Sequence, residues 1–113
     1  MAGTFDHKKN DSGKYMFNLK AGNGQIILTS QLYESKSSAL NGIESVRKNA
    51  GDDARYERKT TSGGEPFFVL TATNGQTIGK SESYDAAAGM ENGIASVKAN
   101  AAEAKLADNT GEA

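Results

Sequence analysis

Hydrophobic and polar residues alternate along the first 30 positions of the chain, and a helical spacing replaces the alternation after Tyr33. Alternation is typical of strands that bury one face, whereas apolar residues three and four positions apart form one face of a helix. The alternation predicts three strands, at Phe5–Lys8, Tyr15–Ala21 and Gln25–Ser30. The helical spacing predicts a buried stripe made of Ala39, Ile43, Val46 and Ala50. The first half is therefore expected to fold as three strands followed by a helix.

The second half of the chain repeats this pattern with a shift of 51 residues and no gap. Residues 4–54 align with residues 55–105, and 18 of the 51 aligned pairs are identical. The repeat predicts two strands at Pro66–Ala72 and Gln76–Ser81, and a second buried stripe made of Met90, Ile94, Val97 and Ala101. The opening residues belong to the first copy, so we expect them to be ordered.

Asn-Gly turns connect the second and third strands of both halves, and this dipeptide is a strong hairpin signal. A three-residue loop, with Gly24 or Gly75 in the left-handed region, would pair residue 21 with 25, 19 with 27 and 17 with 29. Phe17, Leu19 and Ile27 would then share one face. We prefer this register because a slip of one residue would move the apolar set to the wrong side of the sheet.

Each predicted helix carries a glycine beside its buried stripe, Gly42 in the first and Gly93 in the second. A glycine inside a helix costs about 1 kcal/mol relative to alanine. Its presence in both copies predicts that the helix backbone lies close to the sheet. Tyr33 and Tyr84 precede the helices, and we expect their rings to pack beneath the helix starts.

The ends of the helices and of the ordered chain are predicted from single residues. Glu34 or Ser35 can start the first helix, and Asp85 can cap the second. Residues 106–113 contain one bulky apolar residue, Leu106, so we expect a flexible tail there.

A half with a single helix buries too little surface to be stable alone, so the two halves are expected to fuse. The expected fold class is α+β: a tandem pseudo-two-fold repeat of β-β-β-α units. It would form one mainly antiparallel sheet of about six strands with both helices on one face. A single domain would span residues 1–113, with repeat 1 at 4–54 and repeat 2 at 55–105. The strand order across the junction is not readable from the sequence.

Three motifs occur in both halves: Phe-x-Leu-x-Ala-x-Asn-Gly-Gln-x-Ile, Ser-x-x-Tyr and Asn-Gly-Ile-x-Ser-Val-[Arg/Lys]-x-Asn-Ala. Over residues 3–105 the chain resembles the YegP-like family of small bacterial proteins. The resemblance implies a β3-α unit, present as tandem copies or associated subunits, with one continuous sheet and exchange of a strand between the halves. It implies no established activity, because the family is uncharacterised. The second copy departs where Pro66 replaces Tyr15 and Gly79 replaces Leu28, so the outer sheet faces are not equivalent.

Composition limits the chemistry that the chain can carry. It has no cysteine and one histidine, which removes disulfides, thiolate chemistry and metal centres built from several imidazoles. His7 lies on a polar strand and is expected in solvent. No signal-peptide pattern or membrane-spanning stretch is visible, so we expect a cytoplasmic protein. We predict no catalytic residue, metal or cofactor, because no phosphate loop, catalytic triad or pair of carboxylates is evident.

The sheet face opposite the helices is the first candidate site. In the preferred register it carries apolar residues that are unusual for a solvated face, alongside Asn18 and Thr77. This candidate interaction surface consists of Met16, Ile26, Leu28, Phe67 and Val69. The alternative is ordinary surface apolarity, or cover by the first loop or the tail.

A polar flank on each helix is the second candidate. The candidate polar groove consists of Asn41 and Ser45 with their counterparts Asn92 and Ser96. Two such flanks could line a shared groove. The alternative is that Asn49 and Asn100, one turn further along, cap the helix ends while the other side chains bond to neighbouring backbone.

A non-enzymatic module that presents a surface to a protein partner or to a second copy is the leading hypothesis, because almost every repeated residue has a folding role. Nucleic-acid binding is the alternative, since a small sheet can enter a major groove. The candidate basic residues are Lys14, Lys20, Arg55, Arg58 and Lys59. The net charge of -1 disfavours this alternative, and we expect no membrane binding.

Overall fold

The computed structural model describes residues 3–111, which form one seven-stranded sheet and two α-helices. The first half contains β1 (Thr4–Lys9), β2 (Tyr15–Lys20), β3 (Ile26–Thr29) and α1 (Lys36–Asn49). The second contains the 3-10 turn η1 (Asp53–Arg55), β4 (Tyr56–Thr60), β5 (Pro66–Thr71), β6 (Thr77–Lys80), α2 (Ala87–Asn100) and β7 (Lys105–Asn109). The α+β class with a mainly antiparallel sheet is confirmed.

The strand order is β4-β5-β6-β3-β2-β1-β7, so the two halves meet where β3 lies beside β6. The only registered pair of strand residues at this seam is Thr29 with Lys80, and these two are counterparts under the shift of 51. The seam therefore joins corresponding positions of the two halves. One strand crosses between the halves, as the resemblance implied, because β7 of the second half lies beside β1 of the first half at the sheet edge.

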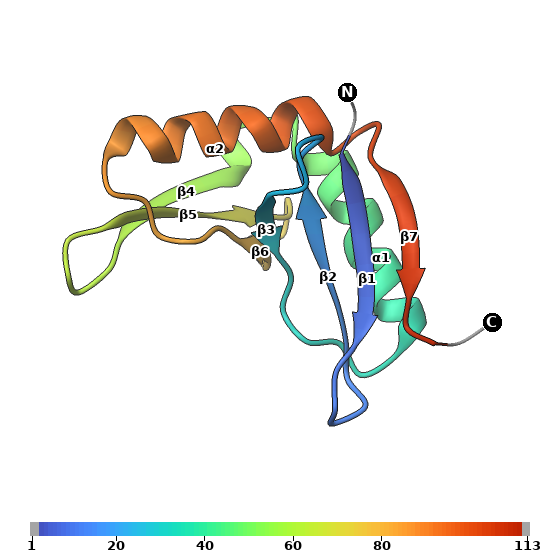
Figure 1. The fold of residues 1–113 in the computed structure, drawn as a ribbon. Coiled ribbons are helices and arrows are strands. Elements are labelled where there is room, and N and C mark those ends of the chain that lie inside the picture. Colours follow the sequence, from blue (N-terminus) through green and yellow to red (C-terminus); the bar gives the residue numbers. More distant parts are fainter. Residues whose placement is uncertain (1–2, 112–113) are drawn as a thin grey trace.

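The sheet bends sharply at the seam. In Figure 1, β1, β2 and β7 run across the direction of β4 and β5. Helix α2 covers β4 and β5, and α1 lies behind β1 and β2. Each helix also contacts the other half, α1 at β5 and β6, and α2 at β3. The two halves consequently share one interior, and no helix of residues 3–111 lies on the opposite face of the bent sheet.

Residues 105–109 form a strand, so the expectation of a flexible tail is wrong for this segment. β7 runs parallel to β1 along the sheet edge. Asn109 Nδ2 donates to Asp6 Oδ1 at 2.6 Å, and Lys36 Nζ lies 2.7 Å from Asp108 Oδ2. Backbone pairing with β1 and these polar contacts hold the segment, which explains why its few apolar residues gave no signal. Residues 112 and 113 of the predicted tail lie outside the described residues.

The hairpin register agrees with the prediction beside the turn and departs from it further away. The amide of Ala21 donates to the Gln25 carbonyl, and Gly24 has a φ of 87°. A bulge then shifts the pairing, so Leu19 faces Leu28 rather than Ile27. The second hairpin has the same shift, with Leu70 facing Gly79. One extra residue in β3 and one in β6 therefore bring Leu28 and Gly79 to the helix face.

Both predicted helical stripes are buried against the sheet, as the spacing required. The Tyr33 ring stacks on Phe17 with centroids 6.2 Å apart, and its hydroxyl lies beneath Gly42. A Cβ atom on Gly42 would be 2.8 Å from Tyr33 Cζ, and one on Gly93 would be equally close to Tyr84 Cζ. The predicted close approach of both helices to the sheet is present.

The two helix starts differ. Ser35 caps α1, since its hydroxyl accepts a hydrogen bond from the Ser38 amide at 3.1 Å. The N-cap of α2 is Ala86, which has no side-chain cap, so the prediction that Asp85 caps α2 is wrong. Asp85 precedes the cap position by one residue. Separately, no helix within residues 3–111 is long and apolar enough to cross a membrane.

Candidate functional site

A cavity of about 390 Å³ lies at the seam between β3 and β6. Its lining consists of five pairs of counterparts under the shift of 51: Ile26 and Thr77, Leu28 and Gly79, Thr29 and Lys80, Ser30 and Ser81, Gln31 and Glu82. The cavity is therefore lined by corresponding positions of the two halves. Its volume is within the range of small-ligand sites, which is roughly 300–1,000 Å³.

The two halves contribute corresponding positions to the cavity, but the side chains at its floor differ. A Cβ atom on Gly79 would be 2.7 Å from Cδ2 and Cγ of Leu28. One bulky side chain thus fits at the seam, and the first half supplies it. The apolar wall consists of Ile26 and Leu28, while Lys80 and Glu82 bring both formal charges of the lining from the second half.

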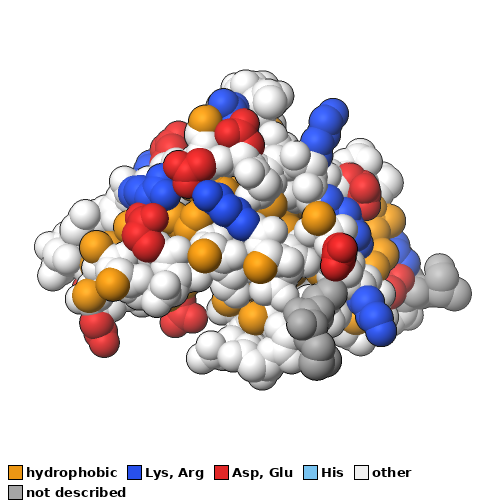
Figure 2. Space-filling model, turned by 90° about the horizontal axis from the view of Figure 1, so that it is seen from above, with side chains coloured by type: hydrophobic (Ala, Val, Ile, Leu, Met, Phe, Trp, Pro, Cys, Tyr) orange, Lys and Arg blue, Asp and Glu red, His pale blue; other side chains and the backbone are white. Residues whose placement is uncertain are grey.

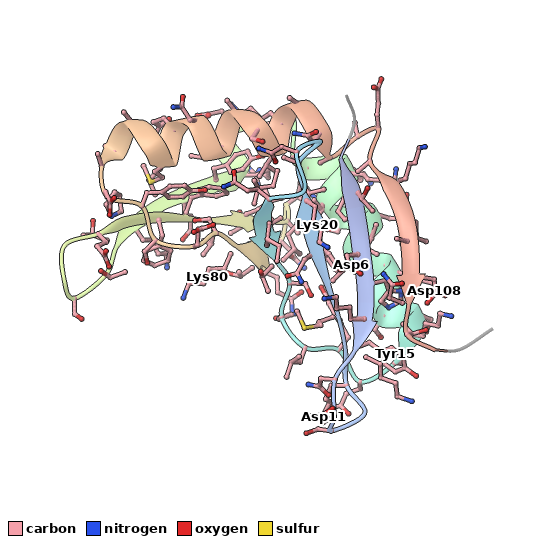
Figure 3. All side chains as sticks on the ribbon, in the orientation of Figure 1. Asp6, Asp11, Tyr15, Lys20, Lys80 and Asp108 are labelled. Carbon is pink, nitrogen blue, oxygen red and sulfur yellow. The ribbon has the colours of Figure 1, made fainter. Side chains whose placement is uncertain are left out.

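Lys80 is the cationic group at the rim of this cavity. It projects from β6 on the side away from α2 (Figure 3). Its Nζ lies 5.0 Å from the centroid of the Phe67 ring. Within residues 3–111, none of the ion pairs includes Lys80. An ammonium held beside an aromatic ring without a carboxylate is available to an anionic group.

Four residues of the predicted interaction surface lie on the open face of the sheet. Ile26 is 42% exposed, Met16 and Phe67 are half-buried, and Val69 is only 6% exposed. Of these four, Ile26 lines the cavity, and Met16, Phe67 and Val69 are not part of its lining.

Leu28, the fifth residue of that surface, was assigned to the wrong face. It is 1% exposed and opposes Leu19 on the helix side, because the bulge in β3 turns it inward. It reaches the cavity only as part of the floor. Gly79 and Lys80 are two of the 33 aligned positions at which the copies differ, so no residue signal singled out the cavity.

A buried carboxylate lies further along the open face. Asp6 is 4% exposed and accepts from Asn109, and the ammonium groups of Lys20 and Lys8 lie 3.2 and 3.3 Å from its Oδ2. Burial acts to raise the pKa of Asp6, but the hydrogen bond from Asn109 and the two ammonium groups outweigh it and lower that pKa. Figure 3 shows Asp6 and Lys20 together on neighbouring strands.

The open face as a whole carries more positive than negative charge. By strand register, two carboxylates, Asp6 and Glu57, share this face with five lysines: Lys8, Lys20, Lys59, Lys80 and Lys105. The chain itself has a net charge of -1. On the face seen from above, over α2, acidic and basic side chains are intermingled and hydrophobic ones are scattered (Figure 2). By register the strands of the open face thus carry five lysines against two carboxylates, and Glu82 adds a third carboxylate at the cavity.

Only the second-half residues of the predicted polar groove line a hollow in the structure. A second hollow of about 570 Å³ lies between the first hairpin and α2, and Asn92 and Ser96 line it. Asn41 and Ser45 are not part of its lining. Asn49 and Asn100 each donate to the carbonyl oxygen of the serine four residues earlier, at 2.8 and 2.7 Å. Asn49 and Asn100 therefore bond within their own helices, whose C-caps are Ala50 and Ala101.

The basic residues considered for nucleic-acid binding do not converge on one surface. Lys20 and Lys59 lie on the open face, whereas Arg58 faces α2 and bonds Glu91 at 2.6 Å. Each of the five has a carboxylate partner: Lys14 with Glu34, Lys20 with Asp6, Arg55 with Asp52, Arg58 with Glu91 and Lys59 with Glu57. Because these cations are paired and lie on separate faces, they would bind a phosphate backbone only weakly.

Titratable groups are dispersed through the described part of the chain. Within it, no three histidine or carboxylate side chains come close enough to hold a metal ion. His7 is fully buried on the helix side, 6.1 Å from the Tyr15 ring centroid, so the expectation of a solvated histidine is wrong. Its burial follows from the extra strand, because Asp108 of β7 lies opposite it.

Comparison with known proteins shows what this chain is similar to. The model of the family described as "Domain of unknown function (DUF1508)" matches residues 10–57 and 62–108. A UPF0339 protein of Bordetella pertussis is 57% identical over 110 residues, covering 97% of this chain and 98% of that protein.

Two solved structures share the fold along nearly their whole length. The solution NMR structure of the protein of unknown function yegP from E. coli has a TM-score of 0.94 and 51% identity, covering 100% of this chain and 97% of that one. The solution NMR structure of a UPF0339 protein from Shewanella oneidensis has a TM-score of 0.90 and 44% identity, covering 96% and 92%.

Proposed function

This chain belongs to the DUF1508 family, and from that premise we propose that it is a non-catalytic module that binds a protein partner through the open face of its sheet. The observation that carries the proposal is the cavity at the seam, with the exposed side chain of Ile26 on its wall. A concave site with an apolar wall and a few polar groups is the usual form of a binding site.

The repeated residues support binding rather than a reaction. Phe17 and Phe68 fill the interior, and Gly42 and Gly93 allow the helices to approach the sheet. These roles are structural in both copies. The two copies differ at 33 of the 51 aligned positions, and at the seam these differences include Leu28 against Gly79 and Thr29 against Lys80.

Site-specific photocrosslinking tests the proposal. A benzophenone amino acid replaces Ile26 in one variant and Lys48, an exposed residue of α1, in the control. We expect a defined protein band from a lysate of the source cells with the probe at position 26 and none with the probe at 48. Equal labelling by both variants, or none by either, would refute binding through the open face.

Nucleic acid is the competing ligand in the same test. The excess of lysine on the open face would attract any polyanion to some degree. We expect no saturable binding of a labelled DNA duplex at low salt, because the candidate basic residues already pair with carboxylates. Tight binding that weakens steeply with salt would replace the proposed partner.

A further inference from the structure

We infer that the seam cavity accepts a bulky aliphatic side chain from an acidic partner segment, with a carboxylate of the same segment beside Lys80. The inference rests on the proposed function and specifies the chemistry of the partner. Two observations carry it: the distribution of apolar and charged groups around the cavity, and the excess of positive charge on the open face.

The apolar part of the segment is indicated by the wall and floor of the cavity. Ile26 forms one side and Leu28 the floor, where the Leu28 side chain occupies the position that a side chain on Gly79 would need. The Ile26 side chain is 42% exposed, so a partner side chain placed there would remove hydrocarbon from water on both molecules. Anchors of this kind, buried in a pocket at the centre of an interface, supply most of its binding energy.

The acidic part is indicated by the charges. Lys80 has no carboxylate partner within residues 3–111, and its Nζ is held beside Phe67. Lys8, Lys20 and Lys59 pair with Asp6 and Glu57 on the open face. Lys80 and Lys105 are outside the ion pairs of residues 3–111, and their charge favours approach of a negatively charged segment. Glu82 also lines the cavity, and it disfavours a second carboxylate on its own part of the rim.

The broken symmetry at the seam gives the segment one direction. A cavity with identical halves would accept a ligand equally in two orientations related by a two-fold rotation. Here Leu28 faces Gly79 and Thr29 faces Lys80, so the apolar and cationic groups are on different sides of the seam. An aliphatic side chain and a neighbouring carboxylate can satisfy both groups in a single orientation.

Fluorescent peptides measure this recognition directly. The probe is a synthetic decapeptide with one central leucine flanked by glutamates, and its partners have serine in place of leucine or lysines in place of the glutamates. We expect the first peptide to bind with a Kd below about 1 mM. Loss of the leucine should weaken binding about 10-fold or more, because burying that side chain is worth roughly 1.5–3 kcal/mol.

A charge reversal on the protein is the second test of this recognition. Lys80→Glu should weaken binding of the glutamate peptide about 3- to 10-fold, since it replaces an attraction with a repulsion at an exposed site. The same variant should improve binding of the lysine peptide. Lys48→Glu makes an equal charge change on α1 and should leave both affinities within about twofold, because screening is strong at that distance. Circular dichroism checks that each variant is folded.

The outcomes separate the inference from the proposed function. No saturable binding of the glutamate peptide, or equal binding of its serine version, would overturn the inference. Equal weakening by Lys80→Glu and Lys48→Glu would also overturn the inference. If the peptide tests fail but the crosslinker at position 26 captures a partner, open-face binding stands and only the assigned chemistry is wrong. If no crosslink forms, the proposed function itself is wrong.

Discussion

Replacing Gly42 with alanine tests how closely α1 approaches the sheet. A Cβ atom at this position would lie 2.8 Å from Tyr33 Cζ, closer still to the Tyr33 hydroxyl oxygen, and 3.1 Å from Phe17 Cε2. Both rings are stacked on each other, so neither can move without disturbing the interior. The substitution therefore places a methyl group where two aromatic rings already fill the space.

Two opposing contributions determine the size of the effect. Overpacking of a core costs about 1–3 kcal/mol, whereas replacing a glycine inside a helix with alanine gains about 1 kcal/mol. Three close approaches to rigid atoms place the cost near the upper end of that range. We expect Gly42→Ala to lower the free energy of unfolding by about 1–2 kcal/mol, and to lower Tm by about 4–8 °C.

Gly89 in α2 provides a matched control. A Cβ atom there would meet Tyr84 Cδ1 at 3.5 Å, an ordinary contact, so Gly89→Ala should be neutral or stabilising by up to about 1 kcal/mol. Urea denaturation followed by circular dichroism measures both variants. Tyr33→Phe combined with Gly42→Ala should recover part of the loss, because it removes the closest atom. Equal stability of Gly42→Ala and Gly89→Ala would refute the close approach.

Ala86→Ser should stabilise the protein by about 0.5–2 kcal/mol, because it gives α2 the cap that Ser35 gives α1; an unchanged urea midpoint would contradict this role. Asn109→Ala should cost about 1–3 kcal/mol by removing a donor to the buried Asp6, and wild-type stability would show that this contact is dispensable. The pKa of Asp6 is lowered on folding, so its stabilisation is complete above about pH 4 and is lost as pH falls through the folded pKa. Asp6→Asn should therefore be less stable at neutral pH and approach the wild type in acid, whereas a constant difference across that range would contradict the assignment.

The periodicity of the sequence was enough to predict the elements and the buried stripes, because both depend on local spacing. Ala39 and Met90 begin stripes that are fully or nearly buried, and the Asn-Gly turns place Gly24 and Gly75 at positive φ. The close approach at Gly42 and Gly93 was also predictable. In each case the physical constraint acts within one element or between neighbours along the chain.

The features that the sequence did not reveal depend on contacts between distant segments. β7 is defined by backbone pairing with β1, about 100 residues away, which leaves no periodic signature in five residues. Its presence also buries His7. The bulge after Ile26 has no residue signal in either hairpin, and it reverses the face on which Leu28 lies. The apolar open face was therefore predicted from the alternation, whereas the cavity was not, because its floor depends on the bulge.

Native-state amide hydrogen exchange tests most directly whether the two halves form one cooperative body, on which the seam cavity depends. We predict that the slowest amides of β2 and β5 open with the same free energy, because α1 and α2 each pack across the seam. Opening energies that differ between the halves by more than about 1.4 kcal/mol, a tenfold difference in exchange, would contradict the shared interior and the site built on it.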